Sequence, residues 1–149
     1  MSTLTIYDSQ FGNTGKVAEA IAAAIPKSKL ARVGDTIITL SSYDLLIIGS
    51  PVQGGRPTAT LQNWITSLPN LKGSRAAVFD TRFQEDKQNI ALKLLMKTIG
   101  YAAPKIAKSL ESKGATLIAP PEGFIVTSKE GPLKTGELER ATSWAKSLF

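Results

Sequence analysis

Residues 9–15, SQFGNTG, combine groups that could bind a phosphate. Ser9, Asn13 and Thr14 have short side chains that can donate hydrogen bonds, and Gly12 permits a tight turn with close backbone approach. If a helix begins here, its first N–H groups lack partners and its dipole favours an anion. Asn or Thr at this place is equally typical of a plain helix cap. The loop taken alone therefore fits a phosphate cradle and a helix cap equally well.

Other phosphate-binding motifs are incomplete in this stretch. A nucleoside-triphosphate loop needs Gly, four residues and then Gly-Lys-Ser/Thr, but Gly15-Lys16 is followed by Val17, and Gln10 stands where the first Gly belongs. The dinucleotide pattern G-x-G-x-x-G is absent too. A phosphoacceptor domain would want Asp where Gly49-Ser50 stands, and a small tyrosine phosphatase would need a Cys in the first loop. These four classes are poorly supported.

The composition removes the usual catalytic groups. The 149-residue chain has no Cys and no His, so thiolate chemistry is impossible and the commonest general base and metal ligand are missing. We expect no catalytic residue and no metal site, and any redox chemistry would depend on a bound cofactor. The net charge of +6 comes from basic residues spread along the chain, without an RNA-binding motif, so we expect no nucleic-acid partner. The N-terminus shows no signal peptide and no stretch is long and apolar enough to span a membrane, which predicts a cytoplasmic protein.

Strand-like and helix-like segments alternate along the chain. Apolar runs predict strands at 4–8, 29–33, 44–52, 76–80 and 115–119, the last interrupted by Pro120-Pro121 and resumed at 123–127. Helical spacing predicts helices at 17–25, 58–68 and 135–148, and in two pieces of 87–113 broken around Gly100 and Pro104. The pattern predicts a single domain over 1–149 of the α/β class: a doubly wound five-stranded parallel sheet with helices on both faces.

Ligands of such sheets bind beyond the carboxyl ends of the strands, so the loops at 9–14, 51–57 and 80–86 are the ones to inspect. Together they resemble those of short-chain flavodoxins. The flavodoxin first loop reads Ser/Thr-x-x-Gly-x-Thr, which matches 9–14, and YDLLIIGSPVQGGRP (43–57) and AVFDTRF (77–83) resemble its later strands and loops. The resemblance extends through APPEGFIV and the terminal helix, and it implies the strand order 2-1-3-4-5.

The resemblance implies a noncovalently bound flavin mononucleotide (FMN). The phosphate would lie on the first loop, at Ser9, Gln10, Phe11, Gly12, Asn13 and Thr14. The isoalloxazine ring would lie between two later loops, at Pro51, Val52, Gln53, Gly54, Gly55, Asp80, Thr81, Arg82 and Phe83. In flavodoxins a Gly-containing peptide near the ring reorients on reduction, and Gly54 is the matching position, although Gly54-Gly55 also suits an ordinary tight turn.

This chain departs from the flavodoxin pattern in three places. Gln53 stands where many flavodoxins have a stacking aromatic, which predicts weaker flavin binding unless Phe83 or Phe11 compensates. Arg56 and Arg82 fall in the ring loops, where they could favour the reduced anionic flavin or simply be solvated. The third departure is the unusually apolar segment 86–100, which fits a cover for the flavin, a contact surface or a buried core helix.

The leading hypothesis is an FMN-binding protein that shuttles electrons. Flavodoxins are typically acidic and dock on basic redox partners, whereas a net charge of +6 suits an acidic redox partner protein or a small-molecule acceptor. One alternative is an FMN-dependent reductase or oxidase of a small substrate such as a quinone or tetrapyrrole. Another is a flavin-free interaction module with the same fold. The oligomeric state is left open.

Overall fold

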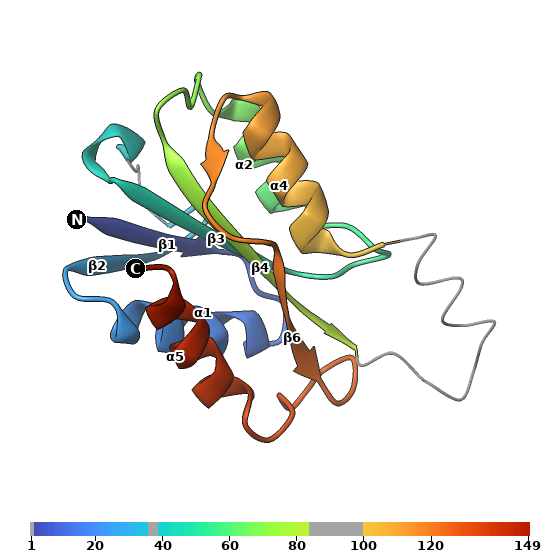
Figure 1. Cartoon of the computed structure of the whole chain (residues 1–149). Coiled ribbons are helices and arrows are strands. Elements are labelled where there is room, and N and C mark those ends of the chain that lie inside the picture. Colours follow the sequence, from blue (N-terminus) through green and yellow to red (C-terminus); the bar gives the residue numbers. More distant parts are fainter. Residues whose placement is uncertain (1, 36–38, 84–99) are drawn as a thin grey trace.

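A parallel β-sheet forms the centre of the molecule in the computed structural model, which describes residues 2–35, 39–83 and 100–149 (Figure 1). Its main path runs β2-β1-β3-β4-β5, as predicted. The strands are β1 (Thr3–Tyr7), β2 (Ser28–Arg32), β3 (Leu45–Pro51), β4 (Arg75–Phe83), β5 (Thr116–Leu117) and β6 (Glu122–Val126). Because all the pairings are parallel, the ends of β1, β3 and β4 face the same edge of the sheet.

The fifth position of the sheet is shared by two short strands, β5 and β6. Both pair with β4, β5 at the start of that strand through Ala76 and Leu117, and β6 at its end through Phe79 and Glu122. The Pro120-Pro121 pair lies between them, and proline cannot donate to a β-ladder, so the strand is interrupted there. The predicted resumption of the strand is confirmed, and it carries the chain out to the end of β4.

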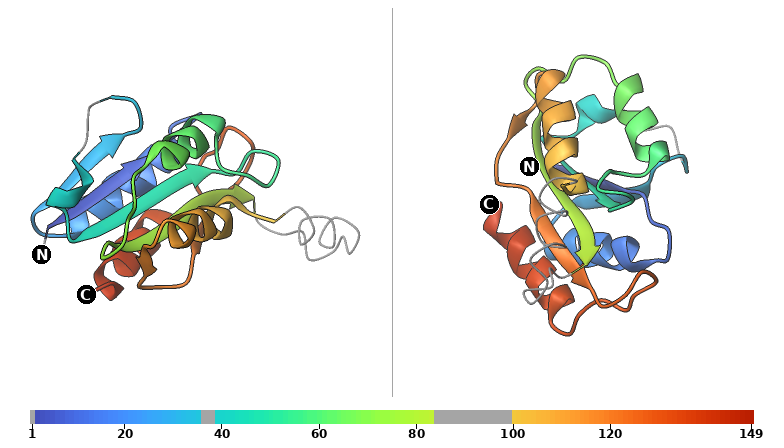
Figure 2. Two further views of the ribbon diagram at one scale, coloured as in Figure 1. Left: turned by 90° about the horizontal axis from the view of Figure 1, so that it is seen from above. Right: turned by 90° about the vertical axis from the view of Figure 1, so that its right-hand side faces the viewer.

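Helices cover both faces of the sheet, as Figures 1 and 2 show. Two of them, α1 (Asn13–Ala24) and α5 (Glu137–Ser147), lie on one face, and α2 (Ala59–Ser67) and α4 (Ala102–Ser112) lie on the other. A short 3₁₀ helix, η1 (Leu40–Ser42), precedes β3. No helix in the described parts of the chain has the length and apolar character that crossing a bilayer requires.

One local prediction is wrong. A break at Pro104 was expected, but Pro104 lies in the first turn of α4, where its missing N–H has no intrahelical partner to lose. The predicted helical piece before Gly100, and with it most of the apolar segment 86–100, lies outside the described residues.

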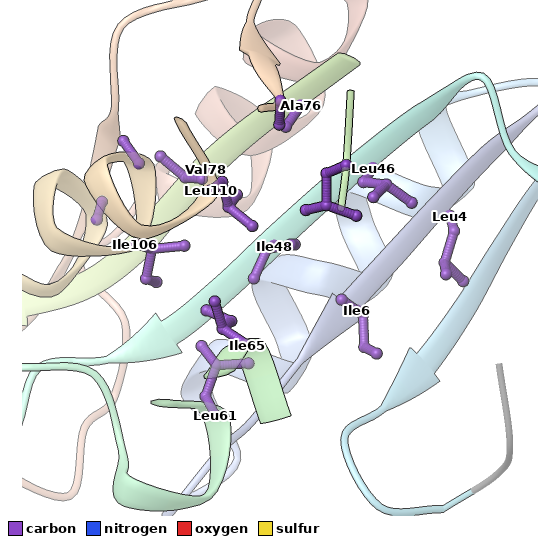
Figure 3. Close-up of a cluster of buried hydrophobic side chains, with 14 of the residues drawn as sticks. Leu4, Ile6, Leu46, Ile48, Leu61, Ile65, Ala76, Val78, Ile106 and Leu110 are labelled. Atoms are coloured by element: carbon purple, nitrogen blue, oxygen red, sulfur yellow. The ribbon is translucent and has the colours of Figure 1, made fainter. Parts of the chain in front are cut away.

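Alternate residues of β3 build two separate cores. Leu46 and Ile48 are buried against α2 and α4, and Leu45 and Ile47 against α1 and α5. Figure 3 shows the first of these clusters, in which side chains of β1, β3 and β4 meet those of the two helices. Each such side chain contributes about 1.5–3 kcal/mol on burial. The sheet is thus a rigid support for the loops at its carboxyl edge.

Candidate functional site

A cavity of about 550 Å³ lies at the carboxyl edge of the sheet. That volume falls within the range of about 300–1,000 Å³ typical of small-molecule sites. It is lined by Gln10, Phe11, Asn13, Thr14, Pro51, Val52, Gln53, Gly54, Gly55, Thr81, Arg82, Phe83, Gly100, Tyr101, Val126 and Lys129. Most of the predicted binding residues are in this wall, and Ser9, Gly12 and Asp80 lie outside it. Within the described ranges, no cluster of Asp, Glu, His or Cys could hold a metal ion.

The first loop presents unpaired N–H groups at the start of α1. Gly12 adopts φ +93°, a left-handed conformation that favours glycine. The hydroxyl of Ser9 accepts the N–H groups of Gly12 at 3.1 Å and Gly15 at 3.4 Å, so it fixes the loop and keeps its own proton to donate. The backbone N–H groups of Asn13 and Thr14 have no acceptor among the described residues. Such groups at a helix start bind anions.

Thr14 and Thr81 join the first loop to the end of β4. Their hydroxyl oxygens lie 2.7 Å apart, and both residues are buried while lining the cavity. One hydroxyl donates to the other, which leaves the accepting hydroxyl with a proton of its own. The pair can therefore both hold the two loops together and offer a donor to a ligand.

The side chain of Asn13 has a role that its place in the loop does not reveal. Its Nδ2 donates to the carbonyl of Glu130 at 3.1 Å, which ties the start of α1 to the hairpin 127–132 between β6 and α5. That hairpin and the end of β6 bring Lys129 and Val126 into the cavity wall. Neither was predicted, because no local pattern indicates that this hairpin folds against the first loop.

The second loop is a tight turn closed by two backbone hydrogen bonds between Gln53 and Arg56, of 2.8 and 3.1 Å. Gly54 has φ +57° and Gly55 φ +77°, the two positive values that a type I′ turn requires. The Gln53 side chain donates from Nε2 to Oε1 of Gln10 at 2.9 Å, so it links the second loop to the first. Lys105 of α4 donates to the Gly55 carbonyl from outside the turn.

Three aromatic side chains border the cavity. Phe11 is 42% exposed and Phe83 is 43% exposed, unusually high values for large apolar residues. Tyr101, which precedes α4, was not predicted as a site residue because it lies far along the chain from the three loops. One face of its ring carries the Arg82 guanidinium, 3.7 Å from the ring centre. Aromatic rings in the wall of a cavity, two of them exposed and one half-buried, suit a flat apolar ligand.

The guanidinium of Arg82 forms a structural ion pair with Asp80. Its Nε and Nη2 donate to the two carboxylate oxygens of Asp80 at 2.7 and 2.9 Å. Asp80 is fully buried, and this burial raises its pKa while the paired guanidinium opposes the rise. The positive charge that Arg82 was expected to place near a flavin ring is thus largely cancelled by Asp80. Arg56, the other arginine expected there, is exposed and lies outside the cavity wall.

The sheet order and the three loops define a doubly wound α/β protein with a ligand cavity at its carboxyl edge. Residues 4–120 match the sequence profile of the flavodoxin domain family, and the chain belongs to that family. FMN is the cofactor of this family. No curated protein sequence matches the chain.

Solved flavodoxins share the fold along the whole chain. Oxidised flavodoxin 2 from Bacillus cereus superposes with a TM-score of 0.73 at 20% identity, covering 99% of this chain and 97% of its own. Oxidised flavodoxin 1 from the same organism gives a TM-score of 0.71 at 19% identity, with the same coverage. A flavodoxin from Streptococcus pneumonia TIGR4 gives 0.72 at 16% identity, covering 99% of this chain and 97% of its own.

Proposed function

We propose that this chain binds FMN noncovalently in the 550 Å³ cavity and carries electrons through it to a redox partner. The observation that carries the proposal is the mixed character of the cavity wall. It includes the backbone N–H groups of Asn13 and Thr14, which have no acceptor among the described residues and suit a phosphate. It also includes the rings of Phe83 and Tyr101, which belong to other elements and suit a flavin ring.

The phosphate end consists of the start of α1 and the hydroxyls around it. Asn13 and Thr14 would donate their N–H groups, and the Thr14–Thr81 pair would donate a hydroxyl. Ser9 and Gly12 act from behind the wall by shaping the loop. Hydrogen bonds to a charged phosphate contribute roughly 1.5–3 kcal/mol each, so a few of them suffice to anchor the ligand.

The residues that would hold the flavin ring come from the second loop and the end of β4, together with Tyr101. Pro51, Val52 and the Gly54-Gly55 turn would border one side of the flavin, and Phe83 and Tyr101 another. When bound, FMN would supply the electron-carrying chemistry, and these residues would orient it and exclude water from it. Gln53 would contribute an amide edge fixed by Gln10 in place of the usual aromatic face.

Members of the flavodoxin family exchange electrons with redox partners. The finer proposal is that the partner of this chain is an acidic protein or a small-molecule acceptor in the cytoplasm, because a net charge of +6 steers negatively charged partners. Association should then slow steeply as salt is added, since screening weakens such steering.

The test is a titration of the flavin-free chain with FMN, followed by stepwise reduction. The flavin should bind with one equivalent per chain, lose its fluorescence and bleach reversibly on reduction. FMN should bind more tightly than riboflavin, because riboflavin has no phosphate to occupy the start of α1. A chain that takes up neither flavin would overturn the proposal. If the FMN-bound chain reduces a quinone with steady-state turnover, the protein is a reductase and not an electron shuttle.

A further inference from the structure

Lys129 is a cationic side chain in the wall of the cavity, near the start of α1. It lines the cavity together with Asn13 and Thr14, and no carboxylate of the described residues lies within ion-pair distance of it. Arg82, the other cationic residue in this wall, is paired with Asp80. The charge of Lys129 is therefore available to a ligand.

Other cations near the first loop are directed elsewhere. Lys16 lies in the first turn of α1, but it is exposed and outside the cavity wall. The Arg32 guanidinium donates to the Ser9 carbonyl and lies 3.5 Å from the Asp8 carboxylate, so it supports the back of the loop. Of the described basic residues around the first loop, Lys129 is thus the one placed to face a bound anion.

The hairpin that carries Lys129 is tightly built. The N–H of Thr127 donates to the carbonyl of Pro132 at 2.9 Å, and that of Gly131 to the carbonyl of Ser128 at 3.0 Å. A bridge between Val126 and Leu133 extends this pairing. These hydrogen bonds join the backbone on the two sides of Lys129 and define the turn that presents it.

The hairpin is also held against the start of α1. The Asn13 amide donates to the Glu130 carbonyl at 3.1 Å, and a Cβ at Gly131 would lie 2.6 Å from Asn13 Oδ1, so the Asn13 side chain packs directly against the backbone of the hairpin. Because Asn13 contributes both this contact and an unpaired backbone N–H, the lysine and the N–H groups at the helix start are held in a fixed relation.

We propose that Lys129 supplies the positive charge for the FMN phosphate and thereby sets the preference of this chain for FMN over riboflavin. The inference rests on the proposed FMN function. The N–H and hydroxyl donors of the first loop are uncharged, whereas the phosphate carries a charge of about −1.5 to −2 at pH 7. An ammonium group adds a charge-assisted bond that riboflavin, which has the same ring and no phosphate, cannot form.

The experiment titrates FMN and riboflavin into four flavin-free chains: wild type, Lys129→Gln, Lys129→Arg and Lys72→Gln. Lys72 is an exposed residue before β4, at the opposite edge of the sheet, so its replacement changes the net charge equally. Lys129→Gln should weaken FMN binding about tenfold and change riboflavin binding less than about twofold. Lys129→Arg should bind FMN within about threefold of wild type, and Lys72→Gln should match wild type. The salt dependence of FMN binding should also be smaller in Lys129→Gln.

The outcomes separate this inference from the function on which it rests. If Lys129→Gln lowers the affinity for both flavins equally, or for neither, the role of Lys129 is overturned while FMN binding stands. If Lys72→Gln lowers FMN affinity as much as Lys129→Gln does, the effect is one of net charge and the inference again fails. If the wild-type chain binds neither flavin, the proposed function fails and takes this inference with it.

Discussion

Arg82 and Asp80 form a two-point ion pair beside the cavity, with donor–acceptor distances of 2.7 and 2.9 Å. Asp80 has no exposed surface and also accepts the N–H of Ala103 at 2.8 Å, so the pair ties the end of β4 to the start of α4. The guanidinium lies against the Tyr101 ring as well. The end of β4 is therefore positioned by a buried charge pair, and this part of the cavity wall depends on it.

Arg82→Met should destabilise the fold because it leaves the Asp80 carboxylate buried without a counter-charge. Removing one partner of such a pair costs about 3–5 kcal/mol in the free energy of unfolding at pH 7. Burial already raises the pKa of Asp80 above its model-compound value of 3.8, and loss of Arg82 would raise it further. Because the pKa of Asp80 is higher in the folded chain than in the unfolded chain, the protonated carboxyl stabilises the fold at pH values below the unfolded-state pKa. This stabilisation is lost as the pH rises through the folded-state pKa. The deficit of the variant should therefore grow from about pH 4 upward in urea unfolding.

The matched control is the double variant Arg82→Met with Asp80→Asn, which removes both charges. It should recover much of the lost stability at pH 7, because a neutral amide is far cheaper to bury than a carboxylate. If the double variant is as unstable as Arg82→Met alone, the loss comes from packing against Tyr101 and not from the unpaired charge.

Tyr101→Ala should weaken FMN and riboflavin alike, because both ligands share the ring that this side chain would contact. Stacking on an aromatic side chain contributes about 1–3 kcal/mol for nucleobases, which predicts a loss of about tenfold for each flavin. Tyr101→Phe keeps the ring and should stay near wild type. Phe149→Ala, at an exposed position near the end of α5, serves as the control. A loss confined to FMN would place the phosphate, and not the ring, near Tyr101.

Gln53→Trp should strengthen flavin binding, because it restores an aromatic face at the position where this chain has an amide. A gain of about fivefold to tenfold is expected from one stacking contact. Gln53 is exposed and its hydrogen bond to Gln10 contributes little to stability, so the fold should tolerate the change. Gln53→Ala is the control, since it removes the same hydrogen bond without adding a ring. Equal affinities of the two variants would show that the second loop does not face the flavin.

Much of this architecture could be predicted from sequence because it follows from local patterns. Continuous apolar runs such as that of β3 mark strands buried on both faces, and Pro120-Pro121 marks the interruption of the fifth strand. The three loops follow their strands directly, so a resemblance in each loop and a parallel sheet are enough to bring them together. That reasoning anticipated most of the cavity wall.

The remaining wall residues depend on tertiary contacts that leave no local pattern. Tyr101 reaches the cavity because α4 packs beside β4, and Lys129 because the amide of Asn13 fixes the hairpin to α1. Arg82 was predicted in a loop but lies in β4, which continues to Phe83 because it pairs with β6. Its ion pair with Asp80, two residues earlier on the same strand, could not be foreseen, since both residues also suited the ring site. Side-chain pairing across the fold decides these roles, and the sequence does not display it.

Gly131→Ala should loosen the hairpin that carries Lys129, because a Cβ there would lie 2.6 Å from Asn13 Oδ1. Gly136→Ala is a close control: its φ of +91° resembles the +102° of Gly131, but nothing lies within 4 Å of the added carbon. Both variants should share the cost of a strained backbone, about 1–2 kcal/mol. Only Gly131→Ala should also lower the preference for FMN over riboflavin. Equal preferences in the two variants would mean that hairpin position does not affect phosphate binding.

Glu137 should make the region around β6 sensitive to acid. Its carboxylate accepts the Ile125 N–H at 2.6 Å and pairs with Arg140 at 2.7 Å, and hydrogen bonding to Arg140 is the main cause that lowers its pKa from 4.5. Because the pKa of Glu137 is lower in the folded chain than in the unfolded chain, its carboxylate stabilises the fold at pH values above the unfolded-state pKa. This stabilisation is lost as the pH falls through the folded-state pKa. Glu137→Gln should therefore cost about 2 kcal/mol at pH 7, with a shallower loss of stability than wild type below about pH 5. The control is Glu139→Gln, an exposed change in the same first turn of α5, which should leave the stability at pH 7 and its loss in acid near wild type. If Glu139→Gln costs as much as Glu137→Gln, the effect comes from the helix dipole and not from the hydrogen bond to β6.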